Sequence, residues 1–118
     1  MISLTIPIRT VSESNVSEHW TKKSKRHKKQ KKIVSYFLNI HKKKISLPCT
    51  IKLTRCAPNK LDKFDNLPMS FKYILDAICE VITGNFIAGR ADNEIEDEID
   101  VIYRQEVQKN YEIRIEIY

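Results

Sequence analysis

The chain has 118 residues, of which 42% are hydrophobic and 31% charged. This length fits one domain, and the balance is typical of a globular protein rather than a disordered one. No apolar run approaches the roughly 18 residues that cross a bilayer, and no signal-peptide layout is visible, so we expect neither membrane insertion nor secretion. Cys49, Cys56 and Cys79 form no CxxC pair, which favours buried thiols in a reducing cytoplasm.

The net charge of +6 is divided unevenly along the chain. Residues 1–61 carry 15 Lys and Arg against two acids, whereas residues 62–118 carry six against 13 acids. Like charges gathered in one half repel one another unless something offsets them. The basic half therefore either binds a polyanion or is neutralised by the acidic half.

The first elements follow from hydrophobic periodicity. Strict alternation over residues 2–8 predicts a strand that Pro7 places at an edge or ends early. A helix is expected over residues 16–41, with Asn15 as its N-cap. Residues 21–32 include no apolar side chain, so this segment cannot face a core. It is either a solvated basic helix or a segment that orders on meeting its partner.

The later elements show the same two periodicities. They are a strand over 45–54, a helix from about Asp65 to Gly84, an acidic loop over 85–98, and two strands over 99–107 and 111–117. The short link between the last two strands predicts an antiparallel hairpin. The order β-α-β-α-β-β describes one α+β domain over residues 1–118, with helices packed on a mixed sheet.

A first candidate site surrounds the start of the second helix. Asp62 and Asp65 precede it, and a projection at 100° per residue places Lys72 and Asp76 each about 20° from Asp65 on a non-core face. Paired carboxylates beside a lysine suit metal-assisted phosphodiester hydrolysis, because Mg²⁺ prefers carboxylate oxygens. The alternative is a helix cap followed by a solvated polar face.

A second candidate is the acidic run at 89–100, whose six acids repel one another. A metal would offset that repulsion, with Asp92 as the best ligand and Glu94 and Asp97 behind it. Plain solvation, or a partner's basic surface, would also offset it.

A third candidate is the basic segment, where residues 22–32 hold eight Lys and Arg beside the aromatic Trp20. Such segments neutralise backbone phosphates without reading bases. Nucleic acid is the expected partner, and a solvated helix face is the alternative. The candidate DNA-binding residues are Asn15, His19, Trp20, Lys22, Lys23, Lys25, Arg26, Lys28 and Lys29.

Taken together, these segments resemble the RusA family of Holliday junction resolvases in its phage and prophage version. The resemblance rests on Asn-Val-Ser-Glu-His-Trp and the basic stretch in 15–32, on Ala-Pro-Asn-Lys-Leu-Asp and Asp-Asn-Leu-Pro-Met-Ser-Phe-Lys-Tyr-Ile-Leu-Asp-Ala-Ile within 57–78, on Gly-Arg-Ala-Asp at 89–92, and on Tyr-Glu-Ile-Arg-Ile-Glu-Ile at 111–117.

The resemblance implies a homodimeric endodeoxyribonuclease that cuts four-way DNA junctions in recombination and repair, in the cytoplasm of a bacterium or a phage-infected cell. It implies Mg²⁺, with Mn²⁺ as a substitute, held by Asp62, Asp65 and Asp92. Glu94 is a substitute ligand, and Lys72 assists cleavage. The family usually has one residue between the first two aspartates, whereas Lys63 and Phe64 both intervene here. A non-catalytic nucleic-acid-binding domain on the same fold is therefore the second hypothesis, and a protein-interaction module is the third.

Overall fold

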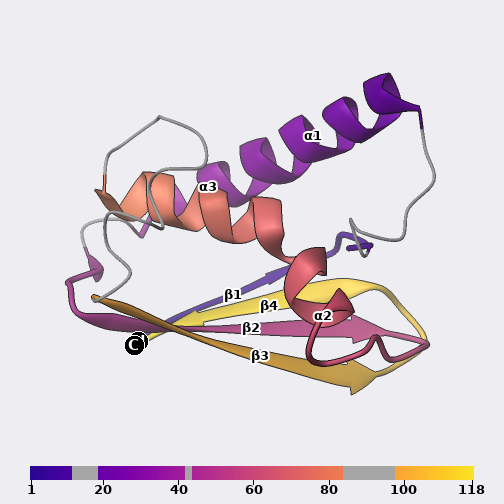
Figure 1. The fold of residues 1–118 in the computed structure, drawn as a ribbon. Coiled ribbons are helices and arrows are strands. Elements are labelled where there is room, and N and C mark those ends of the chain that lie inside the picture. Colours follow the sequence, from indigo (N-terminus) through magenta and orange to yellow (C-terminus); the bar gives the residue numbers. More distant parts are fainter. Residues whose placement is uncertain (12–18, 42–43, 84–97) are drawn as a thin grey trace.

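The computed structural model describes residues 1–11, 19–41, 44–83 and 98–118 (Figure 1). Its elements, in chain order, are β1 (Ile2–Ile6), α1 (Trp20–Asn39), β2 (Cys49–Ala57), α2 (Asn66–Ser70), α3 (Lys72–Thr83), β3 (Ile99–Val107) and β4 (Glu112–Ile117). They form an α+β fold with one mixed sheet, which confirms the predicted fold class.

The four strands lie in the order β1-β4-β2-β3, so β1 occupies the edge position that Pro7 predicts. β2 is parallel to β3, and β4 is antiparallel to both β1 and β2. It follows that β1, β2 and β3 all run in the same direction. Their carboxyl ends therefore meet at one end of the sheet, and the segments that leave these strands begin side by side.

The predicted hairpin of the last two strands is wrong, because β2 lies between β3 and β4. Alternation tells which face each side chain occupies but not which strand lies next to it. No residue of β2 is exposed, which is the burial pattern of an interior strand. The link from β3 to β4 passes around the end of β2, where the Gln108 N–H donates to the Ala57 carbonyl at 3.0 Å.

All the helices lie on one face of the sheet, with α1 and α3 side by side (Figure 1). The core is the layer between these two helices and the sheet. Its largest fully buried hydrophobic side chains are Ile6, Val34, Leu38, Ile51, Leu53, Phe71, Ile74, Ile78, Ile113 and Ile115. The other face of the sheet carries the charged residues of the alternating strands, such as Lys52, which lies 3.9 Å from Glu116.

The single helix expected from Asp65 to Gly84 is broken at Phe71, and Gly84 lies outside the described residues. The Ser70 hydroxyl donates to the Leu67 carbonyl at 2.7 Å, which is the acceptor that a continuous α-helix would offer to the Phe71 N–H. The Phe71 N–H donates instead to the Pro68 carbonyl at 3.1 Å. This tighter turn changes the direction of the chain between α2 and α3.

The strand predicted over 45–54 begins later, at Cys49, and ends at Ala57. Pro48 has no N–H with which to join a ladder, so pairing can begin only after it. The Cys49 N–H makes an early bond of this pairing, to the Glu98 carbonyl at 2.9 Å.

The three cysteines are free and buried, which confirms the prediction of buried thiols. Burial raises the pKa of both Cys49 and Cys56 above its ordinary value. Removal from water disfavours the charged thiolate. Cys49 belongs to the core, whereas Cys56 lies on the other face of the sheet, where its Sγ is 3.9 Å from Glu106 Oε2.

Candidate functional site

The carboxyl ends of β1, β2 and β3 bring three separate parts of the chain to one end of the sheet. β1 leads into Pro7, Ile8 and Arg9, β2 leads into residues 58–65, and β3 contributes Gln105 near its end. In open sheets, ligands bind outside the carboxyl ends of strands. Asp62 and Asp65, two of the predicted metal ligands, lie in this region.

Asp62 and Asp65 share one turn at this end of the sheet. The Asp65 N–H donates to Asp62 Oδ2 at 2.9 Å, and the Leu67 N–H donates to the Asp62 carbonyl at 2.8 Å. Asp65 occupies the N-cap position of α2, yet its side chain makes no capping hydrogen bond. Both carboxylates are exposed, and among the described residues neither has an ion-pair partner. The helix-cap alternative therefore does not account for the Asp65 side chain.

The two residues that lie between these aspartates point into solvent. Phe64 is 83% exposed, and the ammonium of Lys63 lies 5.0 Å from the centre of its ring. Because Asp62 closes the turn by accepting from Asp65, the longer spacing still leaves both carboxylates in one turn.

Gln105 and Arg55 anchor the chain that leads into this turn. The side chain of Gln105 accepts from the Leu61 N–H and donates to the Leu61 carbonyl, both at 2.9 Å. Arg55 is only 7% exposed, and its Nη1 donates to the Asn59 carbonyl at 2.7 Å. Burial lowers the pKa of Arg55 and nearby Arg9 lowers it further, whereas Tyr111 raises it. The segment between β2 and α2 is thus held to two neighbouring strands by polar side chains.

Sequence reasoning missed these two anchors, although a signal was present. Arg55 and Gln105 face each other in the β2–β3 register, and both are polar residues at positions that continue the core-facing alternation. A long polar side chain at a core position needs partners. Here the partner is the backbone that precedes Asp62.

Lys72 and Asp76 do not lie together on one outward face as the projection predicted. Lys72 is exposed at the first position of α3, but Asp76 is buried, with 8% of its surface exposed. The projection could not show this burial, because it comes from another helix: Asp76 lies one turn from both Tyr73 and Glu80, which contact His27 and Lys31 of α1, so α1 covers it. Lys72 therefore remains a candidate, and Asp76 belongs to the interior.

The other predicted metal ligands, Asp92 and Glu94, lie outside the described residues, as does Asn15. Within residues 1–11, 19–41, 44–83 and 98–118, no three His, Cys, Asp or Glu residues gather closely enough to hold a metal ion. The described part of the site therefore offers two carboxylates on one turn.

The basic segment forms a helix that packs on α3. α1 begins at Trp20, where the N-cap is His19, whose Nδ1 accepts from the Thr21 N–H at 3.3 Å. The expectation that its middle faces no core is partly wrong, because polar residues make the contact. His27 stacks on Tyr73 with ring centres 3.6 Å apart, and Lys31 Nζ lies 3.0 Å from Glu80.

The opposite side of α1 is cationic. Four of the predicted DNA-binding lysines are exposed, together with the aromatic Trp20 and with Lys32. Those four are Lys22, Lys25, Lys28 and Lys29. Lys23 and Arg26 are half-buried, and the helix includes no acid over its whole length. Folding therefore leaves most of the positive charge on a water-facing surface.

No helix in the described ranges is long and apolar enough to cross a membrane. A comparison with family models, with curated proteins and with solved structures finds no match to this chain.

Proposed function

We propose that this protein is a Mg²⁺-dependent endonuclease that cleaves branched DNA, as the sequence resemblance to the RusA resolvases implies. The observation that supports this most directly is the turn that holds Asp62 and Asp65. Both carboxylates are exposed, and the chain before them is anchored to β2 and β3 through Arg55 and Gln105. Among the described residues the Asp65 side chain has neither a cap bond nor an ion pair, so it is suited to a ligand, while Asp62 closes the turn through Oδ2.

The oxygens of this turn fit a hard cation. Asp62 uses Oδ2 for the turn, which leaves Oδ1, and the Asp65 side chain makes no capping bond. Asp92 and Glu94 are the candidates for a further carboxylate. When bound there, Mg²⁺ would neutralise charge on a phosphate and lower the pKa of a coordinated water.

The remaining residues have separate roles in this proposal. The exposed lysines of α1 bind backbone phosphates along the DNA arms, and Trp20 offers a flat apolar surface beside them. Lys72 neutralises charge that develops on the phosphorus during attack. Symmetric cutting of a junction requires two active sites, and a two-fold homodimer supplies them.

The test uses a synthetic four-way junction, with and without Mg²⁺. We expect cleavage that stops on chelation and in Asp65→Asn, with junction binding unchanged. Asp100→Asn is the matched control, because Asp100 is an exposed carboxylate at the opposite end of the sheet, near the amino end of β3. Equal loss of cleavage in both variants would contradict the metal assignment.

The second candidate function is nucleic-acid binding without catalysis. Two observations favour it. Among the described residues no three side chains gather to hold a metal ion, and α1 carries its cationic surface without any acid. Tight, salt-sensitive junction binding with no cleavage in Mg²⁺ or Mn²⁺ would establish it in place of the first.

A further inference from the structure

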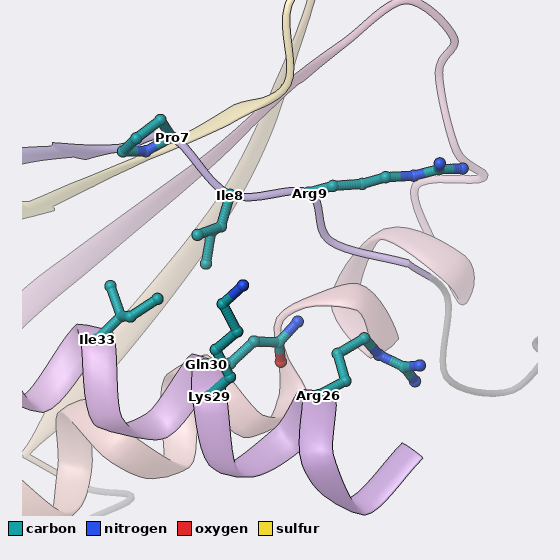
Figure 2. A pocket seen from close by; sticks show the side chains of 7 residues that line it. All are labelled: Pro7, Ile8, Arg9, Arg26, Lys29, Gln30 and Ile33. Atoms are coloured by element: carbon teal, nitrogen blue, oxygen red, sulfur yellow. The ribbon is translucent and has the colours of Figure 1, made fainter. Parts of the chain in front are cut away.

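A pocket of about 270 Å³ lies between α1 and the segment that leaves β1, and neither Asp62 nor Asp65 lines it (Figure 2). Residues 7–9 form one side, and Arg26, Lys29, Gln30 and Ile33 of α1 form the other. The sequence separates these two sides by the whole connection between β1 and α1. The pocket exists because α1 lies across the carboxyl end of β1.

The pocket has an apolar end and a cationic end. In Figure 2, Ile8 and Ile33 point toward each other at one end, and the side chains of Arg9 and Arg26 extend on the other side of Gln30. Lys29 rises from α1 between them, toward Ile8. None of the described lining residues is acidic. Arg9, Arg26 and Lys29 make the lining positive, which attracts an anion and disfavours a cation.

Gln30 supplies a hydrogen-bond donor that the fold does not use. It is 4% exposed, and its Nε2 has no hydrogen-bond partner among the described residues. Figure 2 shows this amide directed from α1 toward the β1 side of the pocket. A buried donor without an acceptor is unfavourable, so an acceptor from a ligand would satisfy it.

The position of Arg9 is also defined by the fold. Its guanidinium carbon lies 4.8 Å from the centre of the Tyr111 ring, a cation–π contact that holds it at the pocket rim. Buried Arg55 is close enough for Arg9 to lower its pKa, so the rim lies in a region of positive potential. The cationic end is thus built from side chains that the sheet positions.

We propose that this pocket binds one nucleotide unit. The phosphate would lie at Arg9, Arg26 and Lys29, Gln30 Nε2 would donate to a ligand oxygen, and the sugar or base would contact Ile8 and Ile33. The volume is below the 300–1,000 Å³ that is usual for larger ligands, which fits one nucleotide rather than a dinucleotide. That the ligand carries a phosphate is inferred from the pocket residues alone. That this phosphate belongs to a bound DNA strand rests on the proposed function.

The experiment follows the Gln30 side-chain amide by NMR in the ¹⁵N-labelled full chain, with the signal assigned through Gln30→Met. Titration with deoxyadenosine monophosphate should shift this signal along a saturable curve. Deoxyadenosine without its phosphate, and inorganic phosphate alone, should each bind at least about tenfold more weakly, because each lacks one end of the ligand. Equal affinity for inorganic phosphate would overturn the nucleotide assignment.

Lys29→Gln and Lys44→Gln are a matched pair, since both remove one exposed lysine and only Lys29 lines the pocket. Lys29→Gln should weaken mononucleotide binding about tenfold, and Lys44→Gln should change it less than about twofold. Equal weakening by both would show a diffuse cationic surface and would overturn the pocket. Both are surface substitutions, so folding is preserved in each.

A short single-stranded oligonucleotide then distinguishes the source of the nucleotide. If it shifts the Gln30 amide and competes with the mononucleotide, the ligand is a residue of the strand. If only the mononucleotide does so, the phosphate site holds and the strand assignment is wrong. Neither result depends on cleavage, so the test can be interpreted even if the protein is not an endonuclease. If the protein cleaves DNA but no ligand shifts the Gln30 signal, the nucleotide pocket is wrong and the endonuclease proposal stands.

Discussion

α1 and α3 cover the same face of the same sheet, but they contribute to the protein in opposite ways. Residues of α3 such as Ile74, Ala77 and Ile78 are fully buried, and the helix carries one lysine. α1 is longer, yet its buried residues are Gln30, Val34 and Leu38, and it includes eight Lys and Arg but no acid. Two helices that lie side by side on one sheet can therefore differ widely in amino-acid composition.

The difference shows which helix the core requires and which surface is left for a partner. An apolar helix gains stability by burying area, whereas a cationic helix without acids loses some through repulsion. α1 limits that loss through contacts with α3, where His27 meets Tyr73 and Lys31 meets Glu80. The exposed lysines of α1 have no ion-pair partner among the described residues, which is why we relate them to phosphates.

The largest effect is expected where α2 meets α3. Phe71 is fully buried and lies 6.0 Å from the ring centre of Tyr103, so Phe71→Ala should lower the free energy of unfolding by about 3–5 kcal/mol. Tyr36→Ala on α1, where 68% of the side chain is exposed, should change it by less than about 0.5 kcal/mol. Urea denaturation followed by circular dichroism measures both. Similar values would mean that the burial of Phe71 adds little to the stability of the fold.

The contrast between the helices was visible in the sequence, because both periodicity and charge are local properties. The apolar stripe from Leu67 to Ile82 predicted buried α3, and the acid-free run predicted exposed cations on α1. What local patterns lack is the identity of neighbours. Nothing in the alternation of residues 99–107 and 111–117 shows that β2 separates these strands.

For the candidate site, too, the sequence predicted the local features but not the long-range contacts. Asp62 and Asp65 lie three positions apart in sequence, and the structure keeps them in one turn. Gln105 bonds Leu61 across 44 residues, and Arg9 contacts Tyr111 across most of the chain, so neither contact has a local signature. The burial of Asp76 had no local signature either, because it depends on α1, which packs on that side of α3.

The second prediction tests the cationic side of α1. Replacing Lys25 and Lys28 by Gln should weaken junction binding and reduce the slope of log affinity against log salt by about 1.8, since each phosphate contact contributes about 0.9. The control replaces Lys44 and Arg104, which are exposed off α1, and has the same net charge. Filter binding over a salt series measures both. Identical slopes would show that overall charge, rather than α1, attracts DNA.

The third prediction concerns the anchor of the aspartate turn. Gln105→Leu removes both hydrogen bonds to Leu61 and leaves a half-buried peptide unpaired, at a cost of about 1–3 kcal/mol. Hydrogen exchange of the Leu61 amide should accelerate with it. Gln108→Leu is the comparison, because Gln108 donates to the exposed Asn110 carbonyl and should matter less. Unchanged exchange at Leu61 would mean that the turn needs no support from β3.

The smallest effect is expected from the ion pair that joins α1 and α3. Lys31 of α1 and Glu80 of α3 lie 3.0 Å apart, with side chains 25% and 14% exposed. A double-mutant cycle with Lys31→Met and Glu80→Gln should give a coupling energy of about 0.5–1 kcal/mol, because partial exposure screens the pair. The coupling should shrink in 1 M salt, where the screening length falls to about 3 Å. A coupling near zero would mean that packing alone, such as His27 on Tyr73, holds the cationic helix against α3.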